Sequence, residues 1–289
     1  MASLKEVKTK ITGVKKTAQI TKAMNMVAAA KLRGAQEKME AFRPYTSKFN
    51  EAMSNLSGGA NTNSFPLMEN RPVKAIELVV VTSDRGLCGS FNANIIKLAN
   101  KKIAEYEAAG KAVSLICVGK KGYQLLKKTG KVRKRYTDTM GNFQMFHARE
   151  IATDLSQQFL DGTVDKVEVL FAEFQSVARQ VPVISQFLPV VPVESEDGTA
   201  KKISGDYIYE PSTEEIMDVL QPLFLNVIIY HAMLEVGAGE HAARMTAMDN
   251  ATNACKDIVA NLTVVYNKAR QAAVTNELMD IVGGAEALK

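Results

Sequence analysis

The sequence is poor in the residues that build redox or metal sites. Its 289 residues include only three cysteines and three histidines. An odd number of cysteines with no Cys-x-x-Cys pair argues against a disulfide framework and fits a reducing compartment; they are Cys88, Cys117 and Cys255. The histidines are scattered along the chain, so we expect no metal site, and we predict no cofactor.

Long apolar runs are also missing. The richest stretch, residues 220–234, is shorter than the roughly 20 residues that a membrane span needs. Pro222, Asn226 and His231 interrupt it. The first residues alternate charged and apolar side chains without the apolar core of a signal peptide. We therefore expect neither secretion nor a direct membrane span.

Positive charge is concentrated at one end of the chain. Residues 1–50 hold eleven Lys or Arg and three Asp or Glu, a net charge of +8, against +5 for the whole chain. A basic arm suits an acidic partner, either nucleic acid or an acidic protein surface, although a solvated helix face has the same composition. With 46% hydrophobic residues, the chain is expected to be globular.

The first segment has the periodicity of a coiled-coil helix. Apolar or small residues recur at spacings of three and four: Leu4, Val7, Ile11, Val14 and Ala18. We expect this helix to end at residues 57–59, where two glycines precede a loop rich in Asn, Ser and Pro. Residues 1–58 are therefore predicted as an N-terminal coiled-coil segment.

The middle of the chain, residues 73–208, alternates short β-branched runs with helical stretches. This alternation predicts a Rossmann-like, doubly wound α/β domain with a mostly parallel sheet covered on both faces. Strands are expected at residues 75–82, 113–118, 132–136, 165–171 and 179–191, and helices at 92–109, 120–128 and 143–160. Prolines place the last strand near an edge of the sheet.

A second long helix is predicted over residues 211–285. It keeps a heptad seam through nine positions: Met245, Met248, Thr252, Cys255, Val259, Leu262, Tyr266, Ala269 and Ala273. Gly237 and Gly239 interrupt the pattern. A hinge, a weak point of the helix and a close crossing of the two long helices are the alternatives, and we favour the close crossing. The predicted fold class is thus α/β, with a long antiparallel two-helix coiled coil attached to the central domain.

An antiparallel hairpin with level ends pairs residue 56 − x with residue 211 + x. This counting brings Met24 near Ala243 and Arg244, and Met1 near Val265 or Tyr266. The end of the C-terminal helix, residues 272–282, is then left without a partner in the chain, although apolar side chains lie on more than one of its faces. We expect an external partner to enclose it.

Three motifs in this order resemble the gamma family of F-type ATP synthases over the whole chain. They are residues 20–29 (ITKAMNMVAA), residues 82–89 (TSDRGLCG) and residues 266–272 (YNKARQA) followed by Thr275 and Glu277. Asn25 stands where the family usually has a charged residue, and Ala30 replaces a common serine. There is no sign of the dithiol insertion of chloroplast relatives or of a transit peptide, so the resemblance is to a bacterial-type subunit.

The resemblance implies a non-catalytic rotor shaft, with no catalytic residue of its own. It implies that the coiled coil turns inside a ring of alternating alpha and beta subunits, driven by proton flow. The central domain would meet the epsilon subunit and the membrane ring of c subunits, at the cytoplasmic face of the bacterial inner membrane. Nucleic acid is not an expected partner.

The resemblance also assigns the residues that would touch these partners. Lys22, Met24, Lys31 and Arg33 are expected to meet acidic loops of beta. Contacts of the C-terminal helix are expected from Arg244, Arg270, Gln271, Thr275 and Glu277.

Two alternatives stay open at this point. One is a nucleotide-dependent enzyme, with residues 83–89 as a phosphate loop or Cys88 as a nucleophile, although neither glycine spacing nor a neighbouring histidine supports it. The same residues also have a purely structural interpretation, in which the glycines permit a tight turn that Asp84 and Arg85 anchor.

The second alternative function is a basic coiled coil that binds nucleic acid.

Overall fold

The computed structural model describes residues 4–59, 65–190 and 212–286. It contains two compact units, which we treat separately. The coil unit consists of residues 1–29 and 244–289, and the sheet unit consists of residues 30–243. Each long helix contributes to both units, so the predicted division into segments 1–58, 73–208 and 211–285 stays a prediction.

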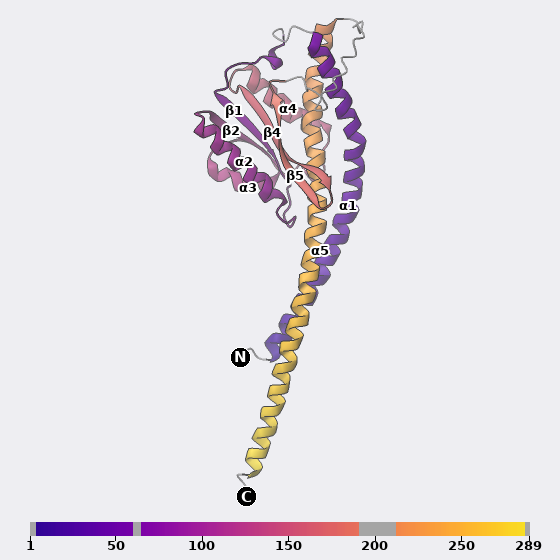
Figure 1. The fold of residues 1–289 in the computed structure, drawn as a ribbon, viewed down its shortest axis with the longest axis vertical. Coiled ribbons are helices and arrows are strands. Elements are labelled where there is room, and N and C mark those ends of the chain that lie inside the picture. Colours follow the sequence, from indigo (N-terminus) through magenta and orange to yellow (C-terminus); the bar gives the residue numbers. More distant parts are fainter. Residues whose placement is uncertain (1–3, 60–64, 191–211, 287–289) are drawn as a thin grey trace. The chain divides into compact units, whose positions relative to one another are not determined.

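Two long helices carry the chain through both units (Figure 1). Helix α1 (Leu4–Gly59) has 56 residues and helix α5 (Thr213–Glu286) has 74, or about 80 Å and 110 Å at 1.5 Å per residue. The predicted end of α1 at residues 57–59 is confirmed. Helix α5 begins where the Ser212 hydroxyl accepts a hydrogen bond from the Glu215 amide at 3.2 Å, which satisfies one of the unpaired donors of the first turn.

The sheet unit contains a five-stranded sheet in the order β3-β2-β1-β4-β5. Its strands are β1 (Ala75–Val81), β2 (Ala112–Val118), β3 (Val132–Tyr136), β4 (Lys166–Ser176) and β5 (Arg179–Leu188). The first four are parallel, and β5 pairs antiparallel with β4 at the edge. The predictions of a mostly parallel sheet and of an edge position for the last strand are confirmed.

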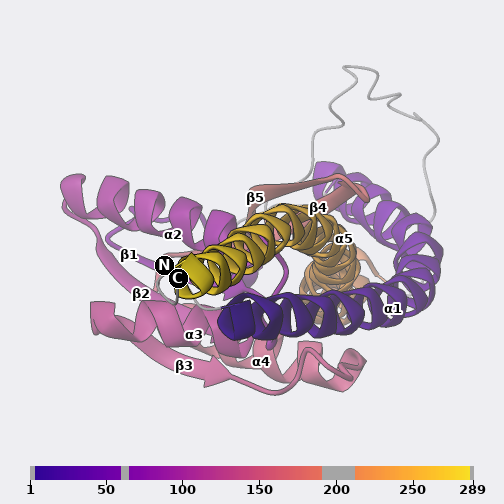
Figure 2. The same cartoon turned by 90° about the horizontal axis from the view of Figure 1, so that it is seen from below.

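Helices cover both faces of this sheet. Helix α2 (Phe91–Ala108) and helix α3 (Lys120–Leu126) lie on one side, and α4 (Met145–Leu160) lies on the other together with α5 (Figures 1 and 2). Right-handed crossovers require this arrangement, because the chain runs outward from β1 to β3 and then returns to β4. Side chains of β4 point alternately to the two faces, and their contacts agree with this placement of the helices. Glu168 accepts a hydrogen bond from Tyr106 of α2 on one face, whereas Phe171 packs edge-on against His231 of α5 on the other.

One hydrophobic core joins these elements. Strand β1 is buried at every position after Ala75, as expected for a parallel strand covered on both faces. The core extends from Met53 and Leu56 of α1 through the sheet to the part of α5 between Met217 and Val236. The sheet and both long helices therefore form one folding unit here.

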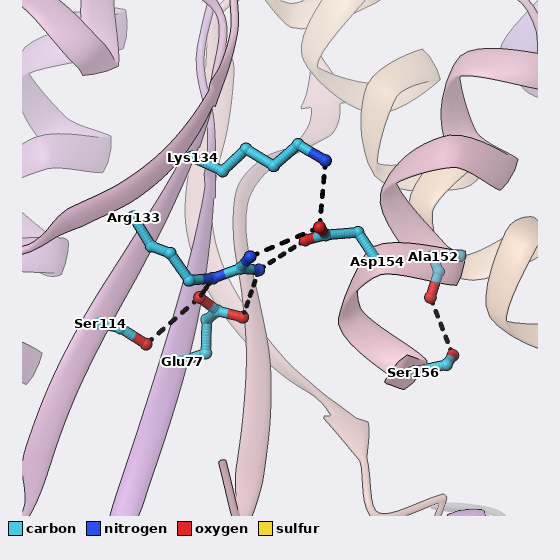
Figure 3. Close-up of polar contacts among 7 residues, drawn as sticks. All are labelled: Glu77, Ser114, Arg133, Lys134, Ala152, Asp154 and Ser156. Carbon is cyan, nitrogen blue, oxygen red and sulfur yellow. Dashed lines mark hydrogen bonds and ion pairs between the residues drawn. The ribbon is translucent and has the colours of Figure 1, made fainter. Parts of the chain in front are cut away.

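A buried carboxylate on β1 is neutralised across the sheet (Figure 3). The Glu77 side chain has no exposed surface, and it accepts two hydrogen bonds from Arg133 of β3, at 2.7 and 3.0 Å. Val132 and Lys134 pair with consecutive residues of β2, so Arg133 is an extra residue in a β-bulge. The bulge turns Arg133 to the same side as Lys134, and both side chains bind Asp154 of α4.

These ion pairs keep the groups charged. Burial by itself would lower the pKa of Arg133, but hydrogen bonds to Glu77 and Asp154 raise it above its ordinary value. Burial likewise works to raise the pKa of Asp154, and bonds from Arg133 and Lys134 outweigh burial and lower it. The cluster therefore fixes β3 and α4 against the centre of the sheet by charge.

Gly237 and Gly239 of α5 lie against aromatic rings of the α/β part and not against α1. Close packing is present, but the expected partner, the other long helix, was wrong. A Cβ atom at Gly237 would lie 3.3 Å from the ring of Phe143, and one at Gly239 would lie 2.8 Å from the ring of Phe91. Both rings follow carboxyl ends of strands, Phe91 after β1 and Phe143 after β3. Helix spacing in the sequence did not reveal that aromatic rings, and not the other helix, approach here.

Helix α5 is long and apolar enough to meet the length and composition of a membrane span, with a window of mean hydropathy 1.5. However, 61% of that window is buried inside the protein. Buried core helices of globular proteins have the same composition. The burial favours a core helix.

The Glu77 cluster generates a stability prediction. Replacing Arg133 with Met leaves a fully buried carboxylate unpaired, so we expect the free energy of unfolding to fall by about 3 kcal/mol. The matched variant Lys134→Met removes only a second, half-exposed partner of Asp154 and should cost no more than about 1 kcal/mol. Urea denaturation measures both, and equal losses would contradict the assignment of Arg133 as the partner on which Glu77 depends.

Candidate coupling surface

In the coil unit, α1 and α5 are joined by polar contacts inside an otherwise apolar seam. The hydroxyl oxygens of Thr21 and Thr252 lie 2.7 Å apart and are buried. One turn along the seam, the side-chain amide of Asn25 donates to the carbonyl oxygen of Met245 at 2.8 Å. Polar groups within a seam of this kind set the register of the two helices, because sliding would leave them unpaired.

The predicted seam of α5 is confirmed position by position. From Met245 to Ala273, each of the nine predicted residues is buried or half-buried, whereas most residues between them are exposed. On α1, Leu4, Val7, Ile11, Val14 and Ala18 are likewise less exposed than their neighbours. The heptad period therefore identified the contact face of both helices.

The predicted register was wrong by about one to two turns. Level ends would place Thr21 opposite residue 246 and Asn25 opposite residue 242, but these side chains bind Thr252 and Met245. The displacement is three to six residues toward the C-terminus. No tight turn joins the two helices, since the whole α/β part of the sheet unit lies between them in the chain, so nothing forces their ends to be level. The expected position of Met1 lies outside the described residues.

The candidate residues from the N-terminal motif have different environments. In the coil unit, Lys22 is exposed and Met24 is half-buried beside the seam. Lys31 and Arg33 belong to the sheet unit, where both are exposed and Arg33 forms an ion pair with Glu37. An ion pair at such exposure contributes little to stability, so Arg33 can exchange Glu37 for another acidic group.

Candidate residues of the C-terminal helix divide into one buried residue and an exposed group. Arg244 is only 8% exposed. Arg270, Gln271, Thr275 and Glu277 are exposed on consecutive turns, and the Thr275 hydroxyl donates to the Gln271 carbonyl oxygen within the helix. Two successive turns thus present a cation, an amide and a carboxylate to any neighbouring surface.

Beyond the last seam residue, Ala273, α5 has no seam. Every residue from 274 to 285 is exposed, including five large apolar side chains: Val274, Leu278, Met279, Ile281 and Val282. These exposed fractions lie between 50% and 68%. A helix with apolar residues on several sides is stable in water only when something else covers it.

The loop after β1 is closed by its own hydrogen bonds. The carboxylate of Asp84 accepts backbone N–H groups of Lys120, Asp138 and Met140, at 2.8 to 3.0 Å. It thereby joins the loops that follow β1, β2 and β3. A phosphate at this edge would need such N–H groups for itself, and the carboxylate would repel it.

The side chains of Ser83 and Cys88 are also hydrogen-bonded within the protein. Asn92 donates to the hydroxyl of Ser83 and to the sulfur of Cys88, which is buried. The prediction that Asp84 anchors the turn is confirmed, whereas Arg85 contributes its carbonyl oxygen, which accepts from Ser83 at 2.6 Å. The phosphate-loop and nucleophile interpretations therefore have no support in the geometry.

Metal chemistry has no candidate site among residues 4–59, 65–190 and 212–286. No group of three or more His, Cys, Asp or Glu side chains there is arranged to hold a metal ion.

Sequence reasoning missed the Thr21–Thr252 pair, although Thr252 was a predicted seam residue. A threonine at a seam position was the available signal, because a hydroxyl buried there needs a partner.

Comparisons with known proteins agree with this geometry. The model of a protein family described as ATP synthase matches residues 3–288. The ATP synthase gamma chain of Desulfotalea psychrophila is 72% identical, and the match covers 100% of both chains. The chain belongs to the ATP synthase gamma family. The gamma chain of Nitratidesulfovibrio vulgaris is 49% identical, again over the full length of both.

Solved structures of ATP synthases contain chains with the same fold. The chain resembles one from the central stalk and c-ring of the Tetrahymena thermophila mitochondrial ATP synthase, with 26% identity and a TM-score of 0.61 over 80% of this chain and 99% of that chain. A chain of the Euglena gracilis mitochondrial enzyme shares the fold, with a TM-score of 0.69 at 20% identity, over 99% of this chain and 94% of that chain. As a gamma subunit, the protein is a non-catalytic component of the central stalk of an ATP synthase, which is a membrane-associated complex.

The seam threonines generate a second prediction. Thr252→Val removes one hydroxyl of a buried pair and should lower the free energy of unfolding by about 1 kcal/mol. In the double variant Thr21→Val/Thr252→Val both hydroxyls are gone, and the loss should be smaller than the sum of the single losses. Thr263→Val, which removes an exposed hydroxyl from the same helix, is the matched control. A double-mutant cycle by thermal unfolding measures the coupling, and strict additivity would contradict it.

Proposed function

We propose that this gamma subunit is the rotating shaft that couples proton flow through the membrane ring to ATP synthesis and hydrolysis on the alpha-beta hexamer. The observation that carries the proposal is the end of α5, where residues 274–285 expose five large apolar side chains beyond the last paired position. Such an end needs an enclosing partner, and a ring of subunits supplies one. The resemblance names that ring as alternating alpha and beta subunits.

The mechanism is an imposed shift in conformational populations. A shaft that presents different side chains in different directions stabilises a different conformation of each neighbouring beta subunit as it turns. The proposed contacts are the exposed or half-buried candidates from both helices: Lys22, Met24, Lys31, Arg33, Arg270, Gln271, Thr275 and Glu277. Arg244, the ninth candidate, is 8% exposed in this chain, and we propose it as a contact of the C-terminal helix beside the others.

The remaining partners are proposed from the family. The central α/β domain, residues 73–208, would meet the epsilon subunit and the ring of c subunits at the cytoplasmic face of the bacterial inner membrane. Neither alternative function has an observation in its favour. The loop after β1 is occupied by Asp84, and the basic residues of the N-terminal arm are explained by an acidic protein surface.

Reconstitution tests the proposed function. Alpha and beta subunits should show steady, multi-turnover ATPase activity only when this chain is added, because the shaft orders their catalytic sites in sequence. Activity that does not depend on the chain would exclude the proposal. Two control measurements on the isolated chain address the alternatives: micromolar ATP binding would favour an enzyme, and salt-sensitive DNA binding would favour a nucleic-acid protein.

The variant Met24→Lys tests the transmission surface. Met24 is half-buried, so a lysine can keep its stem in place while its charge reaches solvent, and we expect assembly to be largely preserved. The new cation adds a contact to acidic loops of beta and should impair the coupling of proton transport to hydrolysis. Val219→Lys adds the same charge at an exposed position of α5, outside the proposed partner contacts, and should not. Proton pumping and ATPase rate are measured in reconstituted vesicles, and equal coupling in both variants would remove Met24 from the transmission residues.

A further inference from the structure

Strand β4 extends beyond its neighbour in the sheet. Its ladder with β1 ends where Val80 pairs with Leu170, whereas its pairing with β5 continues to Ser176. The end of the β4–β5 hairpin therefore has one side without a partner strand. Backbone groups buried on that side need hydrogen bonds from elsewhere.

An ion pair between the two long helices takes the place of the missing strand. The amide of Phe174 donates to Oε2 of Glu235 at 2.8 Å, and the carbonyl oxygen of Phe174 accepts from Nη2 of Arg43 at 2.8 Å. Arg43 also binds Glu235 through two bonds, Nε to Oε1 at 2.9 Å and Nη2 to Oε2 at 3.1 Å. Three elements, α1, α5 and β4, thus meet at one closed set of hydrogen bonds.

The environment favours the charged forms of this pair. The Glu235 side chain is 1% exposed, and Nε2 of His231 lies 3.2 Å from its Oε1. Burial by itself would raise the pKa of Glu235, but bonds from His231, Arg43 and the Phe174 amide lower it. A paired, ionised carboxylate makes stronger and more directional bonds than a neutral side chain.

The directionality of this ion pair matters because the hydrophobic contacts around it are non-directional. Helix α5 packs on the sheet through apolar residues such as Leu225, Ile229 and Met233. Hydrophobic contact resists separation but is non-directional, so it resists rotation of a helix about its axis less well. A bidentate ion pair fixes both distance and angle.

We infer that Arg43 and Glu235 form the joint through which the sheet and both long helices turn as one body. Beyond the joint, α1 and α5 continue without interruption into the coil unit. A torque applied to the sheet reaches both helices directly, rather than α5 alone. Arg43 and Glu235 are positioning residues, and this role rests on the proposed function of the shaft.

Two single variants test the joint in the reconstituted, membrane-bound complex. Glu235→Gln removes the charge with little change of shape. Arg43→Lys keeps the charge but lacks the planar fork that forms the two-bond pair with Glu235 while also donating to the Phe174 carbonyl. In both, we expect proton pumping per ATP hydrolysed to fall by at least about twofold, the lower range for mutations in a coupling network. Lys48→Met breaks an exposed ion pair with Glu51 on the same helix and should keep the parental ratio. The torsional stiffness of single stalled complexes should fall in the same two variants.

A double variant separates the joint from simple stability. Arg43→Met alone leaves Glu235 buried without its main partner and should destabilise the chain. In Arg43→Met/Glu235→Gln the unpaired charge is gone and the Phe174 amide keeps an acceptor, so the melting temperature should recover in part. The link to α1 stays broken, so pumping per ATP and torsional stiffness should stay low. Recovery of coupling together with stability would overturn the joint and leave a structural ion pair.

The outcome also distinguishes the joint from the function on which it rests. A parental chain that fails to confer coupled ATPase activity contradicts the shaft itself. A parental chain that couples, together with Glu235→Gln and Arg43→Lys variants that assemble and couple equally well, contradicts only the joint.

Discussion

Two helices of unequal length share one apolar seam, and this inequality shapes both ends of the coil unit. Helix α5 has 74 residues and α1 has 56, so pairing leaves one end of α5 without a partner. Within the paired part, small and polar residues such as Thr21, Thr252 and Ala28 allow close approach of the helices. Beyond Ala273, apolar residues remain but the partner is gone. The same heptad period thus produces a paired part, in which each helix covers the apolar face of the other, and an unpaired C-terminal end of α5 whose apolar side chains another protein must cover.

The sheet unit has the topology of a binding fold without its usual site. In open α/β sheets, ligands bind beyond the carboxyl ends of the strands. Here Asp84 occupies the backbone N–H groups of the neighbouring loops, and Phe91 and Phe143 are packed against Gly239 and Gly237 of α5. The edge that would hold a nucleotide in an enzyme instead holds a helix. This agrees with a non-catalytic subunit whose sheet supports the two helices.

Much of the fold followed from periodicity. Strands of the sheet appear within a few residues of their predicted positions, because β1 and its neighbours are buried on both faces and therefore continuously apolar. The heptad seam was also predictable, since its period identifies one helix face. Charged residues inside the sheet unit were not predictable. Glu77 looks like a solvent-facing position within a strand, and its partner Arg133 is reached only through a bulge that leaves no signature in the sequence.

The helices and strands, the contact faces of the long helices and the family could be inferred from the sequence, because these depend on local composition and on motifs in a fixed order. The register of the coil, the partners of Gly237 and Gly239, and the pairing of Arg43 with Glu235 became known only from the folded chain. The physical reason is the same in each case. A side chain such as Thr21 or Arg43 can satisfy its hydrogen bonds with many partners, and the choice among them is made by residues some 200 positions away in the chain.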